Sequence, residues 1–192
     1  MKREIVAIDF ETANHSQASI CALGVSHITK RGKVESIYYT LIHPHDDVSY
    51  FDPFNIYIHG IEPEDVEDAP YFYEIYDELM EMFEGNIIIA HNAPFDMGCL
   101  RAACEMDGLE VPPLQYLDTV RLARKVWPDL PNHRLNTVAD YLDIELDHHE
   151  AESDAFACAW ILRKIMEECD EKDIDKLLDI LGYSYKTLKC KK

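Results

Sequence analysis

The first part of the chain alternates short apolar runs with polar turns. Residues 5–10 read Ile-Val-Ala-Ile-Asp-Phe, and two further β-rich runs follow at 19–28 and 34–42. A Lys-Arg-Gly-Lys turn at 30–33 separates the second run from the third. Runs of branched and aromatic residues bounded by polar turns are typical of strands, so this part predicts an antiparallel meander of three strands.

From residue 71 onward, helical spacing of apolar residues alternates with short β-rich runs. The predicted helices are 71–84, 94–107, 119–126, 135–142, 151–168 and 173–181. The two predicted strands of this part are 87–90 and 114–117. The acidic segment 43–70 holds four prolines and is predicted as a loop with one short helix after Pro63. Strands followed by alternating strands and helices predict an α/β fold, with a central mixed sheet of five strands flanked by helices.

Length and composition are those of one soluble domain. The 192 residues suffice for a substantial core, and 47% hydrophobic with 29% charged residues is an ordinary globular mixture. Apolar stretches such as 86–90 are far too short to cross a bilayer, and the N-terminus has a strand pattern rather than a secretion signal. The six cysteines form no CxxC pair, so we expect reduced thiols in a cytoplasmic protein.

The formal net charge of −19 is unevenly distributed. From Val34 through Leu100 there is no Lys or Arg, whereas fifteen Asp and Glu fall in that span. Such a surface disfavours wrapping of long duplex DNA, which needs many bases to neutralise phosphates. It does not exclude a small site that takes its positive charge from metal ions.

The first candidate for chemistry is the pair Asp9 and Glu11 in Ile8-Asp-Phe-Glu-Thr12. Side chains alternate along a strand, so both carboxylates face the same way. Because unpaired buried charges are costly, a cation is expected between them, and oxygen ligands favour Mg²⁺ or Mn²⁺. Taken singly, the pair is explained more simply as a strand end that dips into water.

Two further elements carry acids and a histidine. His91-Asn-Ala-Pro-Phe-Asp96 places Asp96 in the first turn of a helix, which alone is an ordinary position for an acid. In His148-His149-Glu-Ala-Glu-Ser-Asp154, His149 and Asp154 are five residues apart and can converge if the histidine lies in the loop before the helix. Together with Asp9 and Glu11, these residues fit a two-metal phosphoryl-transfer site.

The three elements in this order resemble the histidine subtype of the DEDD group of 3′–5′ exonucleases, similar to the epsilon proofreading subunit of bacterial DNA polymerase III. The segments Ile58-His59-Gly60-Ile61 and Leu117-Asp118-Thr119 resemble lesser signatures of that family. The resemblance spans roughly residues 4–165. It implies a ribonuclease H-like fold. We expect an exonuclease domain at 1–170 and a C-terminal helix and basic tail at 171–192, with the lysine-rich end from Lys186 to Lys192 as a loose tail.

The resemblance also implies roles for individual residues. Two Mg²⁺ or Mn²⁺ ions would be held by four carboxylates, those of Asp9, Glu11, Asp96 and Asp154. His149 would accept the proton of the attacking water, and His148 is one residue too early for that role. The implied substrate contacts are Thr12, Asn92, Phe95, His59 and Ile61. Asp118 is expected to orient its neighbours rather than to bind metal, and Arg121, Arg124 and Lys125 either touch phosphate or form a solvated helix face.

The implied reaction is hydrolytic release of nucleoside 5′-monophosphates from the 3′ end of single-stranded DNA or RNA, with DNA as the first choice. An RNA- or oligoribonucleotide-trimming enzyme of the same group is an alternative. A non-catalytic module that binds a polymerase or another protein partner is an alternative of a different class. All five functional positions are present, which favours an enzyme. The acidic surface predicts short substrates and a shallow dependence of affinity on salt.

Overall fold

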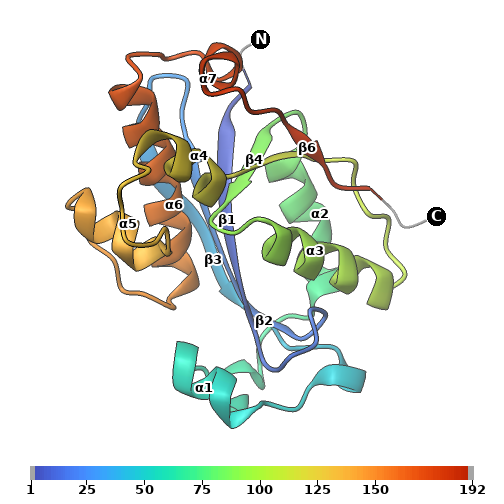
Figure 1. Ribbon diagram of the computed structural model, residues 1–192. Coiled ribbons are helices and arrows are strands. Elements are labelled where there is room, and N and C mark those ends of the chain that lie inside the picture. Colours follow the sequence, from blue (N-terminus) through green and yellow to red (C-terminus); the bar gives the residue numbers. More distant parts are fainter. Residues whose placement is uncertain (1–2, 190–192) are drawn as a thin grey trace.

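The computed structural model describes residues 3–189 and is built around one mixed sheet (Figure 1). The strands run in the order β3-β2-β1-β4-β5-β6. Their bounds are β1 Ile5–Thr12, β2 Ile20–Ile28, β3 Val34–Leu41, β4 Ile87–Ala90, β5 Gln115–Asp118 and β6 Lys186–Thr187. β1, β2 and β3 form the predicted antiparallel meander, and β4 and β5 extend it in parallel with β1.

The prediction of a five-stranded sheet was wrong, because the sheet has a sixth, short strand, β6. The segment from Lys186 to Lys192 was expected to be a loose tail, but Lys186 and Thr187 pair antiparallel with β5. Leu188 is 2% exposed, and its backbone N–H donates to the carbonyl of Leu114. This apolar anchor and the unpaired edge of β5 explain the extra strand, since an edge strand presents free donors and acceptors. Residues 190–192 of the expected tail, with Cys190, lie outside the described residues.

The helices agree with the sequence patterns except for one. Their bounds are α1 Pro53–His59, α2 Phe72–Phe83, α3 Pro94–Met106, α4 Thr119–Val126, α5 Leu135–Tyr141, α6 Ala151–Glu168 and α7 Ile174–Leu181. Short 3₁₀ turns occupy 46–48 and 63–66, and the second is the helix predicted after Pro63. α1 was expected to be loop, yet Asp52 caps its start and Gly60 ends it in the left-handed conformation.

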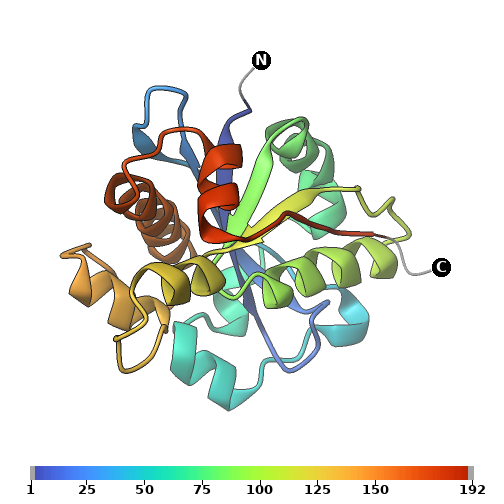
Figure 2. The ribbon, with the colours of Figure 1, turned by 45° about the horizontal axis from the view of Figure 1, so that its top comes forward.

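The sheet is covered by helices on both faces, and β1 divides its side chains between them. Val6, Ile8 and Phe10 pack into the cluster that contains α2 and α3, whereas Ile5 and Ala7 pack into the cluster that contains α4 to α7. Figures 1 and 2 show α2 and α3 on one side of β1 and α6 on the other. Because side chains alternate, Asp9 and Glu11 continue the row that faces α6.

α6 lies unusually close to the sheet at its first turn. A Cβ atom on Gly24, which pairs with Asp9 across β1 and β2, would lie 2.0 Å from the carbonyl oxygen of Ala151. Only glycine permits this approach, and it brings the start of α6 beside the end of β1. Within residues 3–189, we find no helix that is both long and apolar enough to cross a membrane.

Candidate active site

The carboxylates of Asp9, Glu11 and Asp154 converge at the C-terminal end of β1. One oxygen from each of the three side chains lies within 4.8 Å of the others. Asp9 and Glu11 come from alternate positions of β1, and Asp154 comes from the first turn of α6. The two distant parts of the chain that were expected to share a site are therefore brought together.

Asp96 approaches the same point from the first turn of α3. Its side chain is 2% exposed, and its Oδ1 accepts a hydrogen bond from the backbone N–H of Phe10 at 3.2 Å. Phe10 stands between Asp9 and Glu11, so this bond ties the start of α3 to the middle of the acidic pair. The structure thus gathers all four predicted carboxylates around the end of β1.

Both histidines of the third motif lie at this site. Their rings stack with centroids 3.8 Å apart, and His149 has a left-handed backbone with φ 73°. The Nδ1 of His148 lies 3.1 Å from Oδ2 of Asp154, whereas His149 donates its backbone N–H to the same oxygen at 3.2 Å. Asp154 is therefore fixed by one histidine ring and by the backbone of the other histidine.

The electrostatics of this cluster favour its neutral or cation-bound form. Burial, reinforced by Asp96, Asp154 and Glu11, raises the pKa of Asp9 well above its ordinary value. Burial and the same kind of repulsion raise the pKa of Glu11 to about 8, and burial raises those of Asp96 to about 8 and Asp154 to about 6. Within residues 3–189, no Lys or Arg nitrogen lies within 4.0 Å of these carboxylates.

This arrangement fits a divalent cation. Buried carboxylates that repel one another without a cationic partner are costly, and a cation placed among them would remove that cost. Their oxygens are ligands of the type that hard ions such as Mg²⁺ and Mn²⁺ prefer. The site can therefore hold metal through Asp9, Glu11 and Asp154, with Asp96 beside them.

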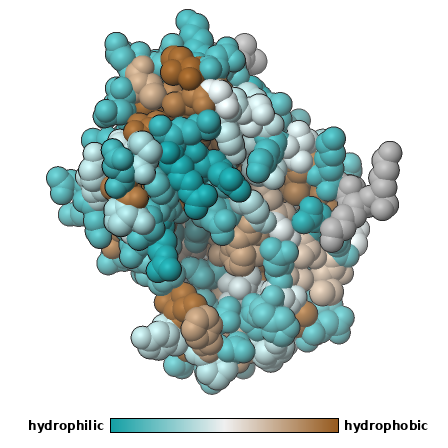
Figure 3. Space-filling model, viewed as in Figure 1, coloured by the Kyte–Doolittle hydropathy of each residue, from teal (hydrophilic) through white to brown (hydrophobic). Residues whose placement is uncertain are grey.

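A cleft of about 670 Å³ opens over the carboxylates. Asp9, Glu11 and Asp154 lie in it, and both histidines of the third motif line it. α1 forms one rim, where Phe54 is 68% exposed and Tyr57 is 86% exposed. On the space-filling view, apolar side chains gather over α1 beside a hollow in the surface (Figure 3).

Four of the five expected substrate contacts line this cleft, namely Thr12, Asn92, Phe95 and His59. The backbone carbonyl of Thr12 accepts hydrogen bonds from Asn55 Nδ2 at 2.7 Å and from His59 Nε2 at 3.2 Å. Ile61 does not line the cleft but packs in a small apolar cluster beside it. It supports His59, because the Nδ1 of His59 accepts a hydrogen bond from the backbone N–H of Ile61 at 3.0 Å.

Asp118 has the orienting position that was predicted for it. The residue is 2% exposed, and its Oδ1 accepts hydrogen bonds from the backbone N–H groups of Asn92 at 3.2 Å and Val120 at 3.0 Å. It therefore joins the end of β5 to the loop before α3. Of the three basic residues considered on α4, only Arg124 lines the cleft.

Several cleft residues were not anticipated. They are Asn55, Val120, Asn132, His133, Arg134 and Leu135. Asn55 was missed because α1 was taken for loop. His133 and Arg134 follow a strongly acidic half of the chain, and that local change of charge is the one signal from which they could have been found.

His91 connects the second motif to this basic segment. Its Nε2 donates to the carbonyl of His133 at 2.9 Å, and its Nδ1 lies 2.9 Å from the hydroxyl of Thr119. Burial lowers the pKa of His91 to about 4, so the ring is neutral at pH 7. His91 therefore fixes the backbone of His133, next to Arg134 in the lining of the cleft.

Comparison with known proteins agrees with this geometry. The family model for Exonuclease, of the RNase T type, matches residues 6–162. The chain belongs to this exonuclease family. The resemblance drawn from the three motifs is therefore confirmed, and so, at the level of the family, is the prediction of a phosphodiester-hydrolysing enzyme. Exonucleases of this family generally use divalent metal ions.

Curated relatives cover most of the chain. It is 32% identical over 183 residues to a DNA polymerase III of the PolC type from Caldanaerobacter subterraneus subsp. tengcongensis, and 29% identical over 185 residues to the 3′-5′ exonuclease DinG of Staphylococcus haemolyticus. These matches include 94% and 95% of this chain. The chain spans only 13% of the first relative's length and 20% of the second's.

Solved structures share the fold. Exonuclease X, in complex with 5′ overhanging duplex DNA, aligns with a TM-score of 0.71 at 24% identity, over 93% of this chain and 99% of that one. The nuclease domain of 3′hExo, a DEDDh family member bound to rAMP, aligns with a TM-score of 0.72 at 17% identity, over 87% of this chain and 93% of that one. The predicted ribonuclease H-like α/β fold is confirmed.

Proposed function

We propose that this protein is a divalent-metal-dependent 3′–5′ exonuclease that releases nucleoside 5′-monophosphates from single-stranded 3′ ends, with DNA as the preferred substrate. The observation that carries the proposal is the convergence of two buried carboxylates, Asp96 and Asp154, two half-buried ones, Asp9 and Glu11, and two histidines beside an open cleft. Two of the relatives named above are a polymerase III and a 3′-5′ exonuclease, which supports this direction of attack and this substrate.

Asp9, Glu11, Asp96 and Asp154 would hold two Mg²⁺ or Mn²⁺ ions. When bound, such ions supply positive charge that stabilises the phosphate oxygens and lowers the pKa of water. The carboxylates themselves are kept at fixed positions by the β1 backbone, by the Phe10 N–H on Asp96 and by the His149 N–H on Asp154.

His149 would accept the proton of the attacking water as a general base. Burial and the neighbouring ring of His148 lower its pKa, which favours the neutral imidazole, and the unprotonated nitrogen of that ring can accept a proton. His148 is the other histidine at the site, and its Nδ1 contacts Asp154 directly. We assign His148 to orienting Asp154, since one nitrogen of its ring is already engaged there.

The rest of the cleft would bind the 3′-terminal nucleotides. Thr12 would meet the 3′ hydroxyl, and its backbone carbonyl is held by hydrogen bonds from Asn55 and His59. Phe95, 38% exposed at the cleft, offers a ring for stacking of a base. Arg124 and Arg134 supply the positive charge for backbone phosphates, and Asn92 lines the same wall.

The test uses a 5′-labelled single-stranded DNA oligonucleotide and an RNA of the same sequence, each with Mg²⁺ or Mn²⁺. We expect a ladder that shortens from the 3′ end, is absent in EDTA and is absent with Asp9→Ala. Two further DNAs test whether the enzyme recognises a free 3′ end: one carries a 3′ phosphate and the other is circular. Neither should be cut as fast as DNA with a free 3′ hydroxyl.

The outcomes separate the alternatives. Faster cleavage of RNA would make the protein an RNA-trimming member of the family and overturn the DNA assignment. No cleavage of either substrate by the folded, metal-loaded protein would overturn the enzyme proposal. It would instead favour a module that binds a polymerase or another partner, an association that the PolC-type relative's name also suggests.

A further inference from the structure

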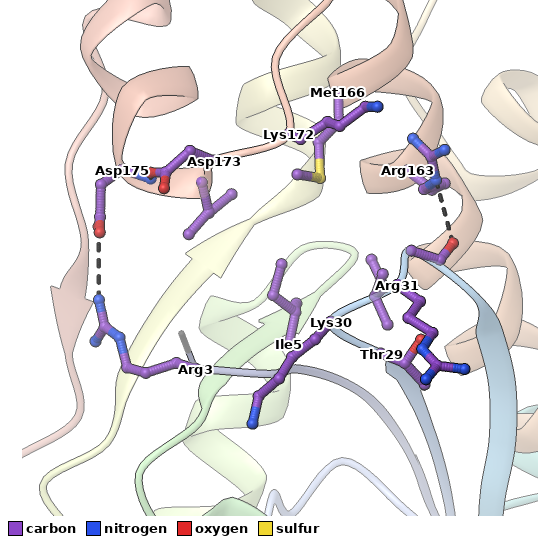
Figure 4. Close-up of a pocket in the computed structure, with 13 residues that line it drawn as sticks. Arg3, Ile5, Thr29, Lys30, Arg31, Arg163, Met166, Lys172, Asp173 and Asp175 are labelled. Atoms are coloured by element: carbon purple, nitrogen blue, oxygen red, sulfur yellow. Dashed lines mark hydrogen bonds and ion pairs between the residues drawn. The ribbon is translucent and has the colours of Figure 1, made fainter. Parts of the chain in front are cut away.

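A second cavity, of about 530 Å³, lies at the other end of the sheet (Figure 4). The start of β1, the turn between β2 and β3, the C-terminal half of α6 and the start of α7 form it. Ile5 lines this cavity and Glu11 lines the acidic cleft. They are six residue steps apart on one strand, which at about 3.3 Å per step is roughly 20 Å. Among residues 3–189, none lines both sites.

The lining is basic although the protein is strongly acidic. The five cations are Arg3, Lys30, Arg31, Arg163 and Lys172. The carboxylates are two, Asp173 and Asp175. In a chain with 18 Lys and Arg against 37 Asp and Glu, such a local excess of positive charge is unexpected and favours an anionic ligand.

Two of these cations are engaged in the wall of the cavity. Arg3 pairs with Asp175 at 3.5 Å, and Arg163 donates through Nε to the carbonyl of Gly32 at 3.2 Å (Figure 4). These contacts tie β1 to α7 and α6 to the β2–β3 turn, so they give the cavity a defined shape.

The other three cations are available to a ligand. Lys30, Arg31 and Lys172 are exposed, and none of the three forms an ion pair with a residue in the range 3–189. Two come from the β2–β3 turn and one from the loop before α7, so they line the cavity from two sides (Figure 4). The negative charge of Asp173 offsets these cations only in part, because its side chain accepts hydrogen bonds from the backbone N–H groups of Asp175 and Lys176.

The cavity also has an apolar floor. Ile5, Ile28 and Met166 are 6%, 4% and 8% exposed and line it, and Ile174 lies beside them. A simple inorganic anion gains no binding free energy from such an apolar floor. An aromatic base does, because it buries apolar surface on it. The volume also lies within the few hundred to about 1,000 Å³ that is usual for small-ligand sites.

We propose that this cavity binds a nucleotide with at least two phosphate groups. The base would lie on the floor formed by Ile5, Ile28 and Met166, and the phosphates would contact Lys30, Arg31 and Lys172. This is a binding site separate from the acidic cleft, and it does not depend on the exonuclease proposal.

The test is calorimetric titration of the full chain with ADP in EDTA at low ionic strength. EDTA removes divalent ions, so the acidic cleft cannot hold the diphosphate through them. We expect saturable binding of one ADP, with pyrophosphate and adenosine each binding at least about 10-fold more weakly. Lys172→Glu and Arg31→Glu should each weaken ADP binding about 10-fold or more, because hydrogen bonds between a charged side chain and phosphate are stronger than those between neutral groups.

Lys176→Glu is the matched control. Lys176 is exposed on α7, four residues from Lys172, and does not line the cavity. The same change of charge there should leave ADP affinity within about 2-fold. As a second readout, the methyl signal of Met166 in a ¹³C-methyl-methionine spectrum should shift with ADP, and the spectrum also reports that each variant is folded.

Absence of ADP binding at millimolar concentration would overturn the proposal. Equal weakening by Lys176→Glu and Lys172→Glu would also overturn it, by showing a general charge effect. Pyrophosphate binding as tightly as ADP would overturn the assignment to a nucleotide. Lys172→Glu should leave nuclease activity unchanged, so failure here is distinct from failure of the exonuclease proposal.

Discussion

The close approach of α6 to β2 gives a sharp prediction for Gly24→Ala. The added Cβ would lie 2.0 Å from the carbonyl oxygen of Ala151 and 2.6 Å from the backbone nitrogen of Glu152. These are backbone atoms of the first turn of α6, so they cannot rotate away as a flexible side chain can. For the oxygen to return to the 3.4 Å at which ordinary contact begins, the two elements must separate by at least about 1.4 Å.

The carboxylate cluster would be pulled apart by that movement. Asp154 lies three residues after Ala151 on α6, whereas Asp9 pairs with Gly24 itself. A misplacement of about 1 Å at a reacting centre can cost on the order of 100-fold in rate. We therefore expect Gly24→Ala to lower kcat by at least about 100-fold. Overpacking should also reduce the free energy of unfolding by about 1–3 kcal/mol.

Gly98→Ala is the matched control for this prediction. The three heavy atoms nearest to a Cβ on Gly98 all belong to the side chain of Gln17, which is exposed and can move. Because alanine is favoured over glycine inside a helix by about 1 kcal/mol, this variant of α3 should be at least as stable as the wild type.

Urea denaturation and the rate of oligonucleotide shortening test both variants together. If Gly24→Ala keeps its rate within about 3-fold and its stability within about 0.5 kcal/mol, the scale of ordinary surface changes, then α6 does not fix the site in the way described.

Other predictions concern the charges of the cleft. Asp9→Asn should abolish cleavage yet raise the urea midpoint of the metal-free protein at pH 8, because it removes one of several repelling carboxylates; a lower midpoint would contradict this. The metal-free protein should lose stability as the pH rises from about 4.5 to about 8, because the folded pKa of Glu11 and of Asp96 is raised to about 8, and the carboxyls ionise in a site that resists charge. Thermal melts in EDTA should show this decline, and a flat profile would count against it. Mg²⁺ or Mn²⁺ should raise the melting temperature more at pH 8.5 than at pH 5.5, since the ion competes with protons; equal shifts would argue against binding by these groups. His149→Ala should reduce kcat at least about 100-fold, within the usual range for a general base, and remove the acid limb of the pH–rate profile, whereas His148→Ala should lower metal affinity and keep that limb. The reverse pattern would exchange the two roles.

Local sequence patterns were enough to predict most of the scaffold. The strands and long helices bury regular rows of apolar residues, so spacing alone predicted them to within one or two residues. The same spacing put Asp9 and Glu11 on one face and Asp96 and Asp154 in first turns of helices. Convergence of these four residues then needed the parallel order of β1 and β4, which brings the start of α3 to the end of β1, and the close packing of α6 against Gly24.

The parts that were missed depend on contacts between distant segments. α1 has seven residues, too short to be stable by propensity, and it is held by hydrogen bonds from Asn55 and His59 to Thr12. β6 consists of two residues that pair with β5 and were taken for a loose tail. The left-handed backbone of His149 could not be inferred from spacing, and it places the ring of His148 on Asp154.

The distribution of charge between the two ends of the sheet makes the molecule an electric dipole. The acidic 46–68 segment lies near one end, and the basic cavity lies at the other (Figure 1). In the field of an approaching nucleic acid, such a dipole turns its basic end toward the nucleic acid. This orientation points the cleft away from the nucleic acid. The range of this torque is about 8 Å at physiological ionic strength and about 30 Å at 0.01 M. Low salt, which strengthens most nucleic-acid encounters, would therefore increase the share of collisions that arrive at the wrong end.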